Sequence, residues 1–499
     1  MTILSAVSRR AVTRTAALVA LCAGCALSAT ARAQNAKRNG EEASQRAIEA
    51  FAAGDFATAR DQLHAALKND PANPALLYNL ACVHAQLGET DQAQERLLDA
   101  ISAGFVDFFQ LERDDSLAPI RKTTTYQAII AGWRRLLDAR NDAELAAMRR
   151  HYGGRYRYEK DEALRLSFVS AFDPTTFEET RSEMRVIAAW AKKTLFTDVS
   201  TSQAQDDDRP DPWTLVLLPT PEDFVLAVGA PDIGGWYDHD RRRLIAQDLG
   251  PSLRHEFLHV LHWRHMTRLG QRHPEWIMEG LGSLVEDITI DGASGLTPAL
   301  SQRTNIAIRL AKAHRLMPIQ RFASMEHKRF VTVRPLAHYA QARSLMLFLN
   351  ERDLLGAWYA RYVQSFADDP TGVKALEDVL GKPAAAIDRE FRAWLIALPE
   401  VAQEIRPGMA SLGVELSLGR GDGPRVARMK PGSPVRKAGL RLGDVVVAID
   451  GVTTRTMDDV VRFLGDHKVG DMVTARIRRG RRFLSVTLTL AAQPPDAGG

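Results

Sequence analysis

The spacing of apolar residues changes along this 499-residue chain, and the changes divide it into segments. Between residues 41 and 104 a set of small and apolar residues recurs after 34 positions. The set is Gly54, Ala59, Leu63 and Ala66, followed by Gly88, Ala93, Leu97 and Ala100. This period is typical of helix pairs that stack into an array. We expect helical repeats within residues 34–138, capped by a helical pair over 105–133, and then a charged helical connector over 134–160.

A mixed pattern follows. Residues 166–170 alternate between apolar and polar as a strand does, and residues 176–196 have the period of an amphipathic helix. Residues 213–218 and 243–247 form short apolar runs, which are typical of buried strands. Helical periods continue through residue 397. The pattern predicts an α+β domain over residues 150–400.

The segment after the last of these strands carries His255, Glu256 and His259 in an H-E-x-x-H pattern. On a helix, this spacing places both imidazoles on one face, where they can bind one Zn²⁺. Glu256 follows the first histidine and is placed to take a proton from a water molecule beside the metal. The pattern predicts a catalytic zinc site.

A catalytic zinc site usually has three protein ligands, so a third is needed. Pro274 can begin a helix in which Glu279 lies among apolar residues, and a buried carboxylate needs a charge partner such as a metal. His265, ten residues after His255, is the alternative. The corresponding H-E-x-x-H-x-x-G-x-x-H pattern of the metzincins requires glycine where this chain has His262. Glu279 is therefore favoured over His265.

The two motifs together resemble the gluzincin metallopeptidases of the peptidase MA type, in which a Trp-x-x-Glu-Gly helix after H-E-x-x-H supplies the third ligand. The resemblance implies a zincin-like fold in residues 160–400. It also implies that residues 234–247 contain an edge strand that pairs with extended substrate.

Residues 336–349 form a strongly amphipathic helical pattern that contains Tyr339. Its Tyr-x-Gln-Ala stretch resembles the Tyr-x-Lys-Gly helix of aminopeptidase-N-like gluzincins, whose tyrosine stabilises the tetrahedral oxyanion. The chain departs from that pattern at Gln341 and Ala342. The resemblance implies an oxyanion role for Tyr339, with His338 as the alternative.

Residues 407–492 contain a glycine loop, a strand pattern and a helix at 457–466. They resemble a PDZ domain of the type found in bacterial exported proteases. The resemblance implies that the loop formed by Leu412, Gly413, Val414 and Glu415 captures protein C-termini through its backbone N–H groups. Residues 399–407 are expected to be a linker, so that the domain selects substrates rather than supporting the catalytic fold.

The first 33 residues have the features of an export signal: three arginines, an apolar stretch over 16–26, and a cleavage site ending at Ala33. Lipoprotein anchoring at Cys25 is a less favoured alternative, and the export route, general secretory or twin-arginine, stays open. We expect a periplasmic or secreted protein without a transmembrane segment. After cleavage only Cys82 remains, so no internal disulfide is expected.

The formal charge of +4 includes four arginines of this signal, which leaves zero afterwards and gives no indication of nucleic-acid binding. The sequence thus predicts a multidomain α+β protein with three parts. The helical repeats resemble tetratricopeptide repeats and form either a peptide groove or a packing spacer. The expected activity is that of a zinc peptidase acting on polypeptides, with endopeptidase favoured over aminopeptidase. The alternative is a non-catalytic adaptor in which the repeats and the PDZ domain bind partners.

Overall fold

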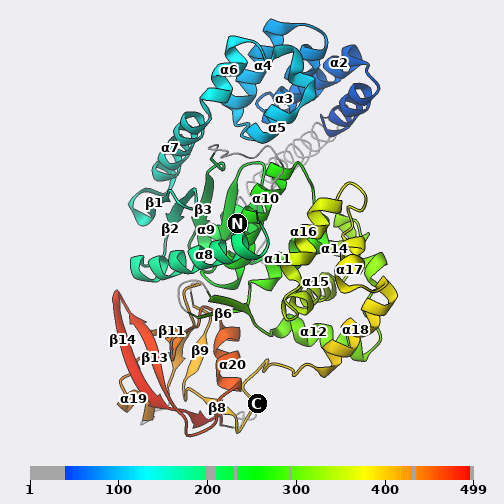
Figure 1. The fold of residues 1–499 in the computed structure, drawn as a ribbon. Coiled ribbons are helices and arrows are strands. Elements are labelled where there is room, and N and C mark those ends of the chain that lie inside the picture. The colour runs from blue at the N-terminus through cyan, green and yellow to red at the C-terminus, as the bar shows by residue number, and fades with distance from the viewer. Residues whose placement is uncertain are drawn as a thin grey trace, which may run out of the picture. The chain divides into compact units, whose positions relative to one another are not determined.

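The computed structural model describes residues 40–197, 210–229, 233–291, 295–419, 421–429 and 434–494 (Figure 1). The expected signal peptide, with Cys25 and the cleavage site at Ala33, lies outside these residues. The chain divides into two compact units, Met1–Leu137 and Asp138–Gly499, which are described separately.

The first unit is helical. Residues 40–52 form a helix, and further helices follow. They are α2 (Phe56–Leu67), α3 (Pro74–Gln86), α4 (Thr90–Ala103), α5 (Phe108–Arg113), the 3-10 helix η1 (Asp115–Ile120) and α6 (Thr124–Ala131). Gly54 and Gly88 follow the helix over residues 40–52 and helix α3, the corresponding helices of the two repeats, with φ of +77° and +76°. The other recurring residues are at most 2% exposed. The predicted 34-residue repeat is confirmed. The expected capping pair is instead three short helices.

The second unit begins within α7 (Trp133–Tyr152) and contains a five-stranded sheet in the order β1-β2-β3-β5-β4. The strands are β1 (Arg157–Asp161), β2 (Leu166–Ser170), β3 (Thr214–Leu218), β4 (Gly235–Asp238) and β5 (Arg243–Ala246). β2, β3 and β5 are parallel, and β1 and β4 are antiparallel edges.

Helices cover both faces of this sheet. Tyr152 of α7 and Phe224 of α9 (Pro221–Val228) pack with Val169, Leu215 and Ile245 on one face. α8 (Pro174–Thr194) and α10 (Pro251–Leu269) pack on the other. β2 is consequently buried at all five positions, so its alternating sequence does not reflect a solvent face. For the same reason, α7 is a packing helix as well as a connector.

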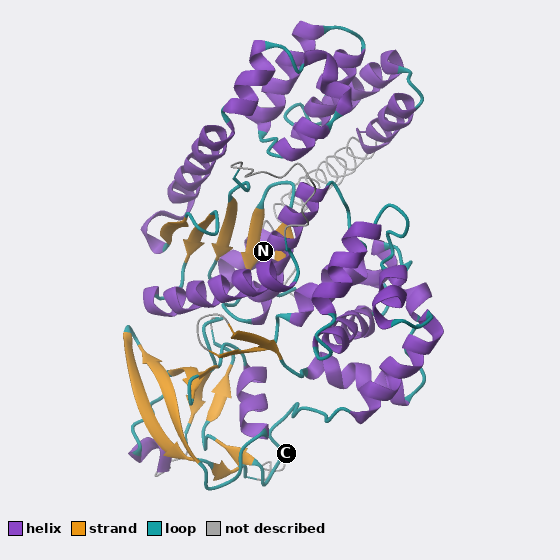
Figure 2. Ribbon diagram, in the orientation of Figure 1, coloured by secondary structure: helices purple, strands orange, loops and turns teal. Residues whose placement is uncertain are grey.

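A helical layer follows α10 (Figure 2). It contains α11 (Glu275–Leu284), the hairpin β6 (Ile288–Asp291) and β7 (Gly295–Pro298), α12 (Gln302–Lys312), α13 (Ile319–Ala323), α14 (His327–Thr332), α15 (Pro335–Asn350), α16 (Leu355–Ser365), α17 (Val373–Leu380) and α18 (Ala384–Ala397). At Gly280 of α11, an added Cβ would lie 3.0 Å from the carbonyl oxygen of Ala342 in α15. The small residues at these two positions therefore let the two helices approach closely.

The C-terminal region is rich in strands. It comprises β8 (Ala410–Ser411), β9 (Glu415–Ser417), β10 (Arg425–Arg428), α19 (Pro434–Lys437), β11 (Val445–Ile449), β12 (Val452–Thr453), α20 (Met457–Gly465), β13 (Met472–Arg479), β14 (Arg482–Thr489) and β15 (Ala491–Ala492). The main sheet has the order β14-β13-β11-β10-β9, and β15 pairs with β8.

The stretch expected to be a linker is attached to the helical layer. The Asn305 side chain accepts from the backbone N–H of Val401 at 2.9 Å and donates to its carbonyl at 2.8 Å. Lys312 pairs with Glu400 at 3.1 Å. The start of this stretch, at Glu400 and Val401, is thus fixed to α12 rather than left free.

Among the described residues, no helix combines the length and the apolar character that a membrane crossing requires.

Candidate metal centre

Helix α10 carries the H-E-x-x-H residues and begins at a strong cap. The Asp248 carboxylate accepts from the N–H of Gly250 at 2.8 Å and of Ser252 at 3.2 Å, which satisfies N–H groups that the first turn of a helix leaves unpaired. The helix then runs unbroken to Leu269. His262 and His265 therefore continue the helix, as expected for a chain without glycine at that turn.

The structure brings His255, His259 and Glu279 together. Their ligand atoms lie within 4.8 Å of one another, with His255 Nε2 at 3.1 Å and His259 Nε2 at 3.5 Å from the Glu279 carboxylate oxygens. An added Cβ at Gly282 would lie 3.1 Å from atoms of both imidazoles, so this glycine keeps space beside them. Two imidazole nitrogens and one carboxylate oxygen are a donor set that fits Zn²⁺.

His265, the alternative ligand, lies elsewhere. Its ring packs 5.1 Å from the ring of Phe196 and 5.7 Å from that of Tyr359, in the buried core behind the helix. It does not belong to the metal-binding group found among the described residues. The arrangement supports Glu279 as the third ligand.

Glu286 orients the first histidine, a role that the sequence did not predict. Its carboxylate lies 2.8 Å from His255 Nδ1 and forms a two-point ion pair with Arg303, at 2.6 and 2.9 Å. A carboxylate bound to the far nitrogen of a ligating histidine fixes the orientation and tautomer of its ring. The only sequence signal was a second carboxylate seven residues, or two helical turns, after Glu279.

Arg254 supports the same position from inside the protein. Its guanidinium donates to the carbonyl oxygen of Glu286 at 2.5 and 3.1 Å and to Glu183 of α8 at 2.8 Å. Arg254, which precedes His255, thus holds the backbone of Glu286, whose side chain orients the ring of His255.

The electrostatics of the site suit a cation. Burial lowers the pKa of His255, but its hydrogen bonds to Glu279 and Glu286 outweigh burial and raise the pKa to about 10. Burial also opposes ionisation of Glu279, yet His259 and His255 hold its pKa well below the usual range. The site therefore stabilises an ionised Glu279 carboxylate beside two imidazoles, which is a set of groups that can bind a divalent cation.

Glu256 points toward the edge strand of the sheet. An added Cβ at Gly235 of β4 would lie 2.7 Å from Cγ of Glu256, so glycine is required where the strand passes the carboxylate. Burial raises the pKa of Glu256, although His255 and His259 partly oppose the shift. A raised pKa suits a group that takes up and returns a proton.

Tyr339 lies beside the site, whereas its neighbours on α15 have other partners. Its ring centre is 6.4 Å from that of His255, and Arg303 lies 5.2 Å from the ring. Burial and the nearby Glu279 raise the pKa of its phenol, so the phenol stays protonated and can donate a hydrogen bond. His338 instead bonds the carbonyl of Phe330 at 2.9 Å, which removes it as the alternative donor.

The loop expected to bind protein C-termini begins at Leu412. The side chain of Leu412 is 2% exposed and belongs to the hydrophobic core of its domain. Gly413 has φ of +66°, which favours glycine, and Val414 is partly buried. Glu415 begins β9, which pairs with β10 on one side. Leu412 is therefore a poor position for testing peptide binding, because a charge there would disrupt the core.

Comparisons with known proteins identify two of the three parts. Residues 410–490 match the model of the PDZ domain and residues 50–107 that of the tetratricopeptide repeat. The chain thus has a helical repeat region and a C-terminal PDZ domain, as predicted.

The curated relatives are proteases. A "Probable periplasmic serine endoprotease DegP-like" from Marinomonas sp. is 29% identical over 106 residues, 21% of each chain. "Protease Do-like 1, chloroplastic" from Arabidopsis thaliana is 27% identical over 157 residues, 29% of this chain and 34% of that protein. The chain thus spans about a fifth to a third of the length of these relatives.

Two solved structures show partial likeness. An aminopeptidase N family protein from Idiomarina loihiensis is 14% identical, with 68% of this chain and 67% of that chain covered and a TM-score of 0.30. An HtrA-type protease, AlgW with the substitution S227A and a bound decapeptide, is 19% identical over 24% of this chain and 37% of that chain, with a TM-score of 0.17.

Proposed function

We propose that the chain is an exported zinc-dependent peptidase of the gluzincin type. It would be an endopeptidase, which hydrolyses internal peptide bonds of its polypeptide substrates rather than removing residues from their amino termini. The observation that carries the proposal is the group of His255, His259 and Glu279, with Glu256 beside it at the edge of the sheet. This combination would provide a metal site, a base and an edge strand for extended substrate next to one another.

Zinc held by His255, His259 and Glu279 would supply Lewis acidity toward the scissile carbonyl and the attacking water. Glu256 accepts the proton of that water and delivers it to the leaving amine, which its raised pKa favours. Tyr339 donates its phenol hydrogen to the developing oxyanion. Glu286, held by Arg303, keeps the His255 ring in place throughout.

Strand β4 is suited to bind the substrate backbone. It pairs only with β5 among the described strands, which leaves its other edge available. Extended peptides add to such edges through main-chain hydrogen bonds and need little side-chain selectivity. The sequence contains no Gly-x-Met-Glu-Asn stretch, the motif that would bind the amino terminus of a substrate. An endopeptidase is therefore favoured over an aminopeptidase.

Export to the periplasm or medium is proposed from the leader sequence, with cleavage after Ala33. The periplasmic location printed for several curated relatives supports this proposal.

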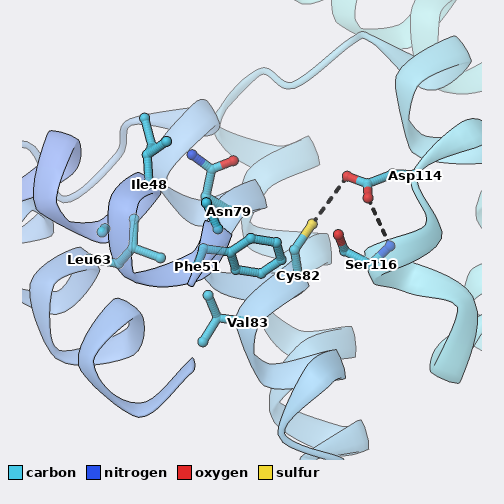
Figure 3. A pocket seen from close by; sticks show the side chains of 10 residues that line it. Ile48, Phe51, Leu63, Asn79, Cys82, Val83, Asp114 and Ser116 are labelled. Carbon is cyan, nitrogen blue, oxygen red and sulfur yellow. Dashed lines mark hydrogen bonds between the residues drawn. The ribbon is translucent and has the colours of Figure 1, made fainter. Parts of the chain in front are cut away.

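The repeats favour a second candidate, a non-catalytic adaptor. A cavity of about 260 Å³ opens in the first unit between apolar residues Ile48, Phe51, Leu63 and Val83. Figure 3 shows Cys82 and Ser116 on the side of Asp114, whose carboxylate they contact. Such a cavity could hold one apolar side chain of a partner peptide. The complete set of metal-site and base residues nevertheless favours the peptidase.

The decisive experiment is the change Glu256→Gln in the full chain. It preserves the shape of the side chain and all three proposed ligands but removes the base. Hydrolysis of a peptide library should fall at least ~10²-fold while zinc content stays at that of the wild type. If zinc-loaded wild type cleaves no peptide, the adaptor is correct, and if Glu256→Gln retains full turnover, the chemistry lies elsewhere.

A further inference from the structure

The PDZ domain contacts the two segments that carry the proposed metal ligands. One contact lies at the start of α10, and the other lies directly after Glu286. We propose that the PDZ domain holds the metal ligands in position and so determines metal affinity, in addition to any role in selecting substrates. The inference rests on the proposed function, since it concerns the same metal site.

The first contact is a close approach of two backbones. The N–H of Leu249 donates to the carbonyl oxygen of Gly421 at 2.8 Å, two residues before α10 begins. An added Cβ at Gly421, whose φ is +92°, would lie 2.2 Å from the carbonyl oxygen of Gln247. Only glycine permits this approach without displacement of the start of α10.

Arg455 of the PDZ domain also packs against the start of α10. An added Cβ at Gly250 would lie 2.7 Å from Cβ of Arg455, whose side chain is almost fully buried. Its guanidinium lies 3.5 Å from Glu179 of α8, which also pairs with Arg476 of β13. A buried cation requires such partners, so the packing of this arginine depends on the catalytic domain.

The second contact is an ion pair beside the ligand support. Arg462 of α20 pairs with Asp287 and, at 2.7 Å, with Asp459 of its own helix. Asp287 directly follows Glu286, whose carboxylate orients His255. A shift of Asp287 would therefore move the carboxylate that fixes the ring of the first ligand.

The two contacts act on His255 from both sides. Leu249 lies just before the helix that carries His255, and Glu286 bonds Nδ1 of His255. Metal affinity depends on ligand distances to within about 0.2 Å and on the residues that support the ligands. Loosening either contact should therefore weaken metal binding even though no ligand is changed.

The test measures zinc affinity of the full chain by competition with a chromophoric chelator, without any peptide. Arg462→Gln removes the ion pair, and Gly421→Ala forces the loop away from Gln247. Each should weaken zinc binding by ~10-fold, the lower end of the effect expected for groups that support metal ligands. The double variant Arg462→Gln/Asp287→Asn should be no weaker than Arg462→Gln alone, and Arg462→Lys should recover part of the loss.

Matched controls lie in the same domain but away from the catalytic domain. Arg428→Gln removes an exposed ion pair with Glu415, and Gly439→Ala strains a glycine with φ of +110° that has nothing within 4 Å of its added Cβ. Both should bind zinc within ~2-fold of the wild type.

Wild-type affinity in Arg462→Gln and Gly421→Ala, or an equal loss in the controls, would overturn the positioning role while leaving the proposed peptidase intact. A wild type that binds no zinc would instead overturn the proposed function, and the positioning role with it.

Discussion

Glu286 shows how the proposed metal site depends on a residue that is not itself a proposed ligand. It joins His255 to Arg303, and Arg254 holds its carbonyl oxygen. Burial opposes its ionisation, but Arg303 and His255 hold its pKa down to about 2. It therefore stays a carboxylate and can keep the proton of His255 on Nδ1, which leaves Nε2 as the ligand atom.

Substitution Glu286→Gln should consequently weaken zinc binding by ~10- to 100-fold, because the amide no longer fixes the charge and tautomer of the ring. The measurement is a chelator competition on the full chain. Glu390→Gln, which removes a carboxylate paired with Lys382 on the surface of α18, is the control and should have no effect. Unchanged affinity in Glu286→Gln would show that the hydrogen bond to His255 is dispensable.

The sequence was sufficient to predict that His255, His259 and Glu279 lie together, but not which residues support them. The i, i+4 spacing of His255 and His259 fixes their common face on any helix. The pairing of Glu286 with His255 depends instead on how the turn after α11 packs against α10, and no local pattern specifies a contact between residues 31 positions apart. Leu412 is a similar case, since its place in a loop motif did not indicate that its side chain is in the core.

At the scale of elements, helix α10 presents different chemistry on its two faces. One face carries the metal-site residues, and the other carries His262 into a buried cluster with His273, Phe196 and Tyr359. His262 Nε2 lies 2.8 Å from His273 Nδ1, and His273 Nε2 lies 3.0 Å from the Gln271 side-chain oxygen. His273 Nε2 donates to Gln271, so its Nδ1 accepts from His262 Nε2. Protonation of His273 at Nδ1 would place two N–H donors opposite each other.

This cluster should make the domain sensitive to acid. Burial, with a smaller contribution from His265, lowers the pKa of His273 to about 3, whereas an unfolded histidine titrates near pH 6.5. Between these values the unfolded state binds more protons, so the free energy of unfolding should fall by ~1.4 kcal/mol per pH unit as the pH decreases below 6.5.

The thermal midpoint followed from pH 7.5 to pH 5 tests this expectation. The variant His273→Asn, whatever its midpoint at pH 7.5, should show a smaller decrease than the wild type. Parallel decreases in the two proteins would mean that other groups dominate the acid response.

Element types were predictable where one pattern dominated, as for β3, β5, α8 and α15. Element types and their burial were harder to predict where contacts with other elements determined them. The polar positions of β2 are buried because helices cover both faces of the sheet, and one of these helices is α7, which was expected to be a connector. Residues 399–407 were expected to be free because their composition is that of a linker, yet Asn305 fixes Val401 to α12.

At the scale of the whole molecule, the PDZ domain is expected to select long substrates by binding their C-termini. Tethering raises the effective concentration of a bound chain near the metal site, which helps long substrates and not short peptides. Val414→Ala, which trims the loop without placing a charge beside the core, should therefore slow cleavage of proteins with apolar C-termini by several-fold and spare a short peptide. Val469→Ala, at a half-exposed turn of the same domain, is the control. Equal loss on both substrates would indicate a structural defect.

The account as a whole depends on which side chains bind the metal, and the zinc stoichiometry of the purified wild type and two variants tests this most directly. Wild type and His265→Ala should each carry about one zinc per chain, because His265 lies in the aromatic cluster behind α10. Glu279→Ala should lose most of its zinc while remaining folded. Retention of full zinc by Glu279→Ala, together with an empty site in His265→Ala, would contradict the account.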